Sequence, residues 1–327
     1  MLKKLATPRN LAILLLVVAL FAFNALFPVL KVPSPVVSLA AEPIFHVGEF
    51  TITNAVFTAW IVMLVLVLMA VAATRRIPRN LAEVSNKELV PSGLQNFMEM
   101  VIEYVYNLAK GIGGNWTARF FPIVMTIFLF VLLSNWMGLL PGFGSIGILE
   151  HPHDPKMVGF ETQGAILTSV PSTEHAAGGH GAGYIVVPFF RAPSTDLNFT
   201  LALGLIAIIL VQYFGVKALG PSYFKKFFDL SGFKQGAFMG AIGIFVGILE
   251  LISEFARILS FGFRLFGNIF AGEVLLSVMA FLIPYIASLP FYGLEVFVGF
   301  IQAAVFMMLA LVFFSTATVG HGTEQYH

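Results

Sequence analysis

Residues 257–273 read Arg257-Ile-Leu-Ser-Phe-Gly-Phe-Arg264-Leu-Phe-Gly-Asn268-Ile-Phe-Ala-Gly-Glu273, which puts ionisable side chains inside one of the most apolar regions of the chain. A charged side chain near the centre of a bilayer costs about 2.5–3.5 kcal/mol on insertion scales, so it is rarely found there without a partner or a water-filled cavity. We therefore interpret Arg264 as a functional residue rather than as part of the packing.

Helical geometry, at about 100° per residue, puts several polar side chains around Arg264. Those on or near its face are Glu250, Arg257, Ser260 and Asn268. Glu254 lies between Glu250 and Arg257 at spacings that permit ion pairs along the helix. Glu273 comes out on the side opposite Arg264. The helix therefore presents its cation and this carboxylate to two different surroundings.

The composition is that of an integral membrane protein. Of the 327 residues, 58% are hydrophobic and only 11% are charged, whereas soluble proteins carry about 25% charged residues. In a bilayer this length corresponds to about five to seven spanning helices with loops. The net charge of +1 gives no support for a nucleic-acid partner, and the lack of cysteine excludes disulfides and cysteine nucleophiles.

Five apolar stretches are long enough to predict spanning helices, over residues 54–73, 120–140, 198–219, 236–283 and 291–314. A sixth, over residues 11–30, is either a first membrane helix or a secretory signal, since small residues before Ala41 offer a cleavage site. We therefore predict an all-α polytopic membrane protein with five or six spanning helices. Residues 1–50 form a leading segment with a linker, and residues 51–327 the membrane domain.

The stretch 236–283 is too long for one perpendicular crossing. As a helix it would reach about 70 Å at 1.5 Å per residue, against a hydrocarbon core of about 30 Å. It must therefore tilt strongly, bend or break. Together with residues 291–314 it is expected to form a long tilted helical hairpin at the carboxy-terminal end.

A different pattern lies between Leu94 and Leu108, where apolar residues recur at helical spacing with charged and amide side chains opposite. This pattern predicts an amphipathic helix. It lies along the membrane surface or against a partner, or it is an ordinary surface helix packed on its own chain.

Two segments outside the spans are interpreted as extramembrane chain. Residues 31–53 contain three prolines and read as a linker, and residues 141–196 read as a long loop. Within that loop, residues 150–181 hold four histidines whose spacing fits no rigid metal template, so no metal site is expected and the role of the loop is left open. Most lysines and arginines fall on the side of the amino terminus, which predicts a cytoplasmic carboxy terminus.

The chain carries no signature of the common catalytic sites, since HExxH, GxSxG and GxxxxGK[ST] are all absent. Glu295 and Gln302 share one face of the last helix and could meet Glu273 or Asn268 of the preceding one. Such groups beside a fixed arginine are typical of an aqueous ion path. An independent secondary transporter and a membrane enzyme are the alternatives, but we find neither internal repeats nor facing groups at metal-ligand spacing.

The segment Ser260-Phe-Gly-Phe-Arg264-Leu-Phe-Gly-Asn268-Ile-Phe-Ala-Gly-Glu273, together with Ile301-Gln302-Ala-Ala-Val-Phe, resembles subunit a of the F-type ATP synthases. The arginine motif is highly specific. Weaker matches are Val90-Pro-Ser-Gly-Leu-Gln95, Ser134-Asn135-Trp-Met-Gly-Leu-Leu-Pro141 and Pro193-Ser-Thr-Asp196-Leu-Asn198. The resemblance therefore runs from near residue 50 to the carboxy terminus.

The resemblance implies a proton-translocating stator subunit beside a rotating ring of c subunits, with b-type peripheral stalk subunits and the rest of the synthase as further partners. The resemblance also implies an energy-transducing membrane, with the bacterial plasma membrane as the first expectation. No cofactor and no catalytic site on this chain are implied. Arg264 would be the essential charge that faces the ring carboxylate, drives its deprotonation and prevents leakage between two half-channels. Glu273, Glu295, Asn268, Gln302 and Asn135 would line the outer half-channel, Glu250 would lie toward the inner one, and Ser260, Glu254 and Arg257 would have supporting roles.

Two positions depart from the family pattern. Glu273 and Glu295 are both carboxylates where some members pair a histidine with a carboxylate, and Gly138 stands where some carry an acid. Two nearby carboxylates tend to share a proton or bind a cation, so proton and sodium coupling both stay open.

Overall fold

The structure is a computed structural model that describes residues 39–75, 77, 91, 93–140, 142–144, 146–150, 159–163, 166–170, 185–227, 236–282 and 288–319. The apolar run 11–30 and the four histidines of the 150–181 loop lie outside these residues. The chain divides into two compact units. The larger comprises residues 37–148, 186–276 and 289–327 and holds every candidate site residue, and the smaller comprises 1–36, 149–185 and 277–288.

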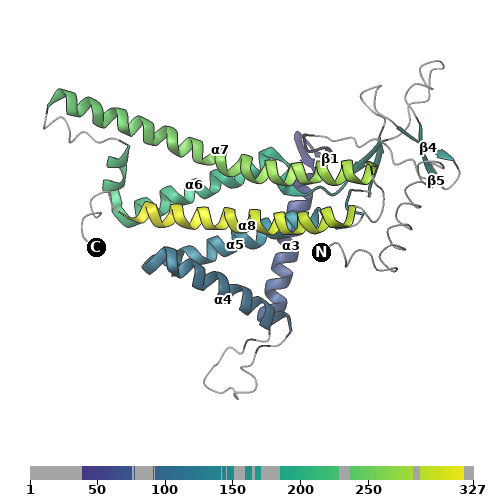
Figure 1. Cartoon of the computed structure of the whole chain (residues 1–327), viewed down its shortest axis with the longest axis horizontal. Coiled ribbons are helices and arrows are strands. Elements are labelled where there is room, and N and C mark those ends of the chain that lie inside the picture. Colours follow the sequence, from purple (N-terminus) through teal and green to yellow (C-terminus); the bar gives the residue numbers. More distant parts are fainter. Residues whose placement is uncertain are drawn as a thin grey trace, which may run out of the picture. The chain divides into compact units, whose positions relative to one another are not determined.

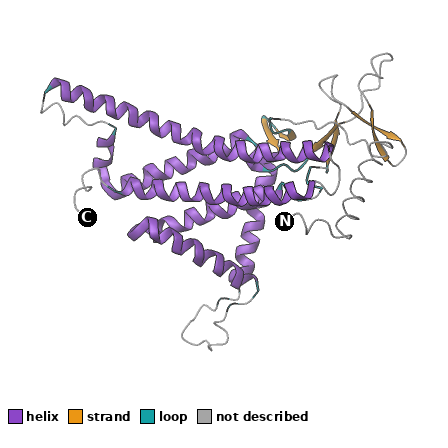
Figure 2. Cartoon of the chain, in the orientation of Figure 1, coloured by secondary structure: helices purple, strands orange, loops and turns teal. Residues whose placement is uncertain are grey.

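Six α-helices make up most of the described chain (Figures 1 and 2). They are α3 (Asn54–Thr74), α4 (Leu94–Gly113), α5 (Thr117–Met137), α6 (Leu197–Leu219), α7 (Ala237–Leu282) and α8 (Leu289–Thr318). Five helical segments of the described chain are long and apolar enough to cross a membrane, with α4 and α5 taken together as one of the five. The predicted all-α class with long apolar helices is confirmed.

Short polar signals set several helix ends. Thr53 caps α3 by accepting a hydrogen bond from the backbone N–H of Val56, and the carboxylate of Asp196 caps α6 by accepting one from Asn198 N–H. α6 ends at Gly220, which has a positive φ of 61° that L-residues with side chains rarely adopt. The Pro193-Ser-Thr-Asp196 motif therefore marks a helix start as well as a family resemblance.

The over-long stretch forms one continuous helix, α7, with 46 residues and a length of about 69 Å. Because it is unbroken, it must tilt or bend to lie in a bilayer. α7 meets α6 through two glycines. A Cβ on Gly204 would lie 3.0 Å from the carbonyl oxygen of Ile258, and one on Gly262 would lie 2.6 Å from Leu201 Cδ2. Small residues here allow the two helices to approach closely.

The core of the larger unit lies between α5, α6 and α8. Phe120, Phe214 and Phe314, one from each helix, form a ring cluster with centroid distances of 4.8, 5.1 and 5.6 Å. All three side chains are buried. These aromatic contacts hold α8 in place, and α8 in turn carries two of the candidate site residues.

α4 is the amphipathic helix expected from the sequence, and it packs on its own chain. Met98, Val105 and Ala109 are buried against the core, whereas Phe97 and Leu108, from the same predicted apolar face, are exposed. The packed-helix alternative therefore accounts for one side of α4, and an exposed apolar strip remains beside it.

Two segments expected to be irregular contain short strand pairs. In the predicted linker, β1 (Pro43–Val47) pairs with β2 (Phe50–Thr53) around a turn with Gly48 at φ 65°. The long loop contains β3 (Gly147–Glu150) paired with β6 (Ile185–Pro188), and β4 (Gly159–Gln163) paired with β5 (Ile166–Val170). The sequence does contain a hairpin signal in residues 43–53, because β-branched and aromatic residues lie on either side of a glycine turn. The three prolines of residues 31–53 favoured the interpretation as a linker instead.

Candidate functional site

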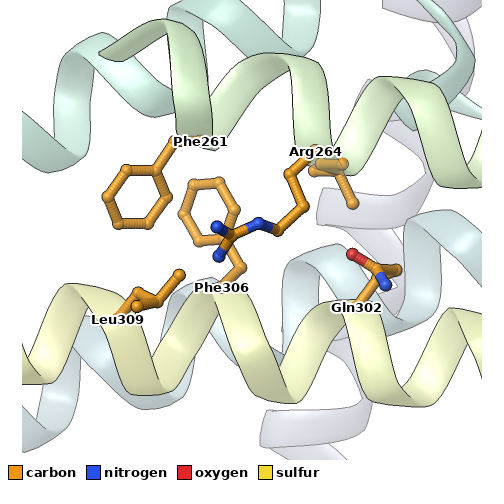
Figure 3. Close-up of a pocket in the computed structure, with 6 residues that line it drawn as sticks. Phe261, Arg264, Gln302, Phe306 and Leu309 are labelled. Carbon is orange, nitrogen blue, oxygen red and sulfur yellow. The ribbon is translucent and has the colours of Figure 1, made fainter. Parts of the chain in front are cut away.

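Arg264 extends from α7 toward α8 into a small cavity (Figure 3). The cavity measures about 10 Å³ and is lined by Phe261, Arg264, Leu265, Gln302, Phe306 and Leu309. This volume is close to that needed for one water molecule. Figure 3 shows the guanidinium near Phe306 and Leu309, with the amide of Gln302 pointing up from α8. Gln302 was expected to face the preceding helix near Glu273 or Asn268, and the structure places it beside Arg264 of that helix.

Arg264 differs in its partners from the two arginines nearest to the site. Arg257 forms an ion pair with Glu254, and Arg191 forms one with Glu273. Arg264 is exposed, and its side chain makes no ion pair or hydrogen bond within the described part of the chain. Since arginine stays protonated in proteins, this position keeps a permanent charge that its own described neighbours do not neutralise.

The other charges in the first half of α7 form a cluster of ion pairs. Lys226 Nζ lies 2.6 Å from Glu250 Oε1 and 2.8 Å from Glu254 Oε1, and Arg257 lies 2.9 Å from Glu254 and 3.8 Å from Glu250. The expected pairing of Glu254 with its helix neighbours is confirmed. Arg257 also stacks over the ring of Phe313 at 5.0 Å, so the cluster connects α7 with α8 and with the 3-10 segment Gly220–Lys226.

Lys226 is the member of this cluster that sequence reasoning missed, because it comes from the segment after α6 rather than from the helix itself. Lys226→Met should destabilise the fold by about 2 kcal/mol, because it removes a charged hydrogen bond from the buried Glu254. Lys225→Met is the matched control, since Lys225 is exposed and its loss should change stability by less than about 0.5 kcal/mol. Thermal unfolding in detergent micelles measures both, and equal stabilities would contradict this role of Lys226.

Glu295 is buried between the last two helices. Its residue is only 6% exposed, and its carboxylate packs directly against Gly272 of α7, where a Cβ would collide with all three carboxylate atoms. The sequence predicted that Glu295 faces the preceding helix, and this is confirmed. It reaches α7 at the residue next to Glu273, so a glycine is needed to admit it.

Asn135 joins α5 to α8. Its amide donates a 2.9 Å hydrogen bond to the carbonyl of Gly299, and the neighbouring Trp136 Nε1 donates to the carbonyl of Val296 at 3.0 Å. The Oδ1 atom of Asn135 is buried and has no hydrogen-bond partner in the described structure. Asn135 thus forms an interhelical hydrogen bond, as a lone asparagine in a membrane helix usually does. It also places a buried acceptor, Oδ1, one helical turn from Glu295 along α8.

Glu273 forms an ion pair with Arg191, with 3.7 Å between Oε2 and Nη2. Arg191 lies in the segment before α6, far from Glu273 in sequence, and no motif pointed to it. The signal that identifies Arg191 is its burial, since an arginine that is only 6% exposed needs charged or polar partners. This burial can be seen only in the folded structure. Ser260 and Asn268 are exposed on α7 beside Arg264, which agrees with the face predicted for them.

Taken along α7, polar groups run from Glu250 to Glu273 over about 35 Å, comparable to the thickness of a hydrocarbon core. The described residues contain no group of three or more histidine, cysteine or acidic side chains placed to hold a metal. The arrangement offers separated carboxylates on the two sides of an unneutralised arginine.

The family model described as ATP synthase A chain matches residues 56–315. This range covers the arginine, every other candidate site residue and all six described helices in whole or in part. The chain therefore belongs to the ATP synthase A chain family, the non-catalytic proton-channel stator subunit of F0.

Proposed function

We propose that Arg264 is the fixed charge that faces the carboxylate of a rotating ring of c subunits. The observation that carries this proposal is the exposed guanidinium, which no described residue of its own chain neutralises. A second protein that presents an acid at this depth would supply the missing counter-charge. Membership in the family implies assembly into the F-type ATP synthase, and the c-ring is the partner that the charge fits.

The physical effect of such an encounter is large. A guanidinium about 4 Å from a carboxylate gains about 4 kcal/mol at an effective dielectric constant of about 20. The ionised form of the ring carboxylate is favoured by that amount while it stands beside Arg264. Since arginine does not release its own proton, it passes none onward and so separates the two proton paths.

The two paths use the polar groups on either side of Arg264. The outer half-channel is formed by Glu273, Glu295, Asn268, Gln302 and Asn135. The inner one runs past Glu250, while Glu254, Arg257 and Ser260 hold its charges in place. The burial of Glu295 and the unpartnered Oδ1 of Asn135 favour a polar path between α7 and α8 on the outer side.

The remaining parts of the proposal concern the setting of the chain. The membrane domain is assigned to residues 51–327. We propose b-type peripheral stalk subunits as further partners, the bacterial plasma membrane as location and a cytoplasmic carboxy terminus. We propose the proton as the transported ion, in keeping with membership in the ATP synthase A chain family.

Cysteine cross-linking tests the ring-facing side of α7. The chain has no native cysteine, so single substitutions report on one position each. Ser260 and Asn268 are exposed on the same face of α7 as Arg264, and Ser260→Cys and Asn268→Cys should cross-link to cysteines in the c subunit. Val67→Cys on α3, 58% exposed, is the control and should not. Cross-linking from Val67 alone would overturn the proposed orientation.

A further inference from the structure

Arg191 is held by three different parts of the larger unit. Its Nε donates a 3.0 Å hydrogen bond to Thr195 Oγ1, its Nη1 donates a 2.8 Å bond to the carbonyl of Ala40, and its Nη2 lies 3.7 Å from Glu273 Oε2. Its backbone N–H also donates to Thr58 Oγ1 of α3 at 3.2 Å. With the residue 6% exposed, the guanidinium is fixed on several sides.

Ala40 leads into the β1–β2 hairpin, and this hairpin lies before the residues matched by the family model, which begin at 56. The base of the hairpin is fastened by Asn54, which is fully buried. The Asn54 side chain accepts a hydrogen bond from Glu42 N–H at 3.2 Å and donates one to the carbonyl of Pro188 at 3.3 Å. The hairpin is thus attached to the segment that carries Arg191.

Aromatic packing strengthens the same attachment. Phe45 of β1 stacks on Phe189 with a centroid distance of 6.3 Å and meets the edge of Phe57 on α3 at 6.1 Å. Phe57 in turn stacks on Phe190 at 6.0 Å. Two of these rings, Phe189 and Phe190, immediately precede Arg191, so the hairpin packs against the backbone that leads into this arginine.

Glu273, at the other end of the ion pair, is in a different situation. Its side chain is 44% exposed on the surface of α7, and a flexible glutamate at such a position samples several rotamers unless it is held. Arg191 is the buried member of the pair and Glu273 the exposed one. The ion pair therefore links the exposed carboxylate to a guanidinium that is fixed by the fold.

We propose that Arg191 is a positioning residue that ties the β1–β2 hairpin to Glu273 and so sets the place of this carboxylate in the outer half-channel. The hairpin, which precedes the residues matched by the family model, then contributes to the site, because the guanidinium that binds Ala40 at its base also orients the channel carboxylate. This inference rests on the outer half-channel assigned to Glu273 under the proposed function.

The test uses the complete synthase in inverted membrane vesicles, with ATP-driven proton uptake normalised to the amount of assembled complex. Glu273→Gln should reduce uptake about ten-fold. Arg191→Gln should reduce it about five-fold, as expected for the loss of an ion pair worth about 1 kcal/mol at a half-exposed carboxylate. Arg191→Lys, which keeps the charge, should recover part of the loss.

The double variant separates positioning from plain structural support. If Arg191 acts through Glu273, Arg191→Gln combined with Glu273→Gln should be no slower than Glu273→Gln alone. Multiplied losses, or a fall in assembled complex with normal uptake per complex, would overturn the inference. Normal uptake in Glu273→Gln would instead remove the half-channel role of Glu273, and the two failures are therefore distinguishable.

The hairpin has its own variants. Asn54→Ala removes the two hydrogen bonds at the hairpin base and should lower proton uptake in the same direction as Arg191→Gln. Thr51→Ala is the matched control, since Thr51 is exposed on β2 and its hydroxyl contacts only His46 within the hairpin among its described hydrogen bonds. Equal uptake in Asn54→Ala and the unmodified protein, at equal assembly, would show that the hairpin does not position Glu273.

Discussion

Arg264→Ala should abolish ATP-driven proton pumping while the subunit still assembles. The side chain is exposed and makes no described contact on which α7 depends, whereas its neighbours Phe261 and Leu265 are buried and anchor the helix. Removing the guanidinium removes about 4 kcal/mol of preference for the ionised ring carboxylate. It also removes the barrier between the half-channels. Proton uptake into inverted vesicles, with co-purification of the complex as the assembly check, measures both effects.

The matched control for this variant is Arg119→Ala. Arg119 is also an exposed arginine, stacked 4.5 Å over the Trp116 ring, and its loss should leave pumping near the normal rate. Arg264→Lys should give only partial activity, because lysine loses its charge more readily when desolvated. Normal pumping by Arg264→Ala in an assembled complex would refute the central role given to this residue.

The sequence was sufficient for the features that depend on one helix. Arg264 was identified by the cost of a charge in an apolar stretch, and the pairing of Glu254 with Arg257 followed from their spacing. The apolar stretch that forms α7 was also recognised as too long for one perpendicular crossing, although the sequence left open whether it tilts, bends or breaks. Each of these inferences uses only residues that are neighbours in the sequence or on one helical face.

The contacts that the sequence did not reveal join distant segments. Lys226 reaches Glu250 and Arg191 reaches Glu273 only because the chain folds back, and neither cation belongs to a motif with its acid. The β1–β2 hairpin is a different case. Its β-branched strands and glycine turn were present in the sequence, but the prolines around them favoured the interpretation as a linker.

Membership in the family decides between the three functions that the sequence had left open: a stator subunit, an independent transporter and a membrane enzyme. The match over residues 56–315 excludes the independent transporter and the membrane enzyme as descriptions of this chain. The match does not assign roles to single side chains. Those depend on the geometry, and the contact of Glu295 with Gly272 is the one that a minimal substitution tests best.

Gly272→Ala should reduce proton pumping by about ten-fold although it adds only one methyl group. Alanine favours a helix by about 1 kcal/mol over glycine, so α7 itself should not suffer. The new Cβ would occupy the place of the Glu295 carboxylate, and overpacking of this kind costs about 1–3 kcal/mol unless the neighbour moves. Displacing Glu295 moves a buried acid out of the outer path, and a loss of about 1.4 kcal/mol already corresponds to ten-fold in rate.

Gly293→Ala is the matched control for this last substitution. Gly293 lies on α8 two residues before Glu295, and a Cβ there would meet nothing within 4 Å, so the same glycine-to-alanine change should leave pumping unaltered. The effect of Gly272→Ala should also disappear when Glu295 is shortened, because Glu295→Asp withdraws the carboxylate from α7. If Gly272→Ala pumps at the normal rate in an assembled complex, the acid beside it is not on the proton path and serves only to pack α8 against α7.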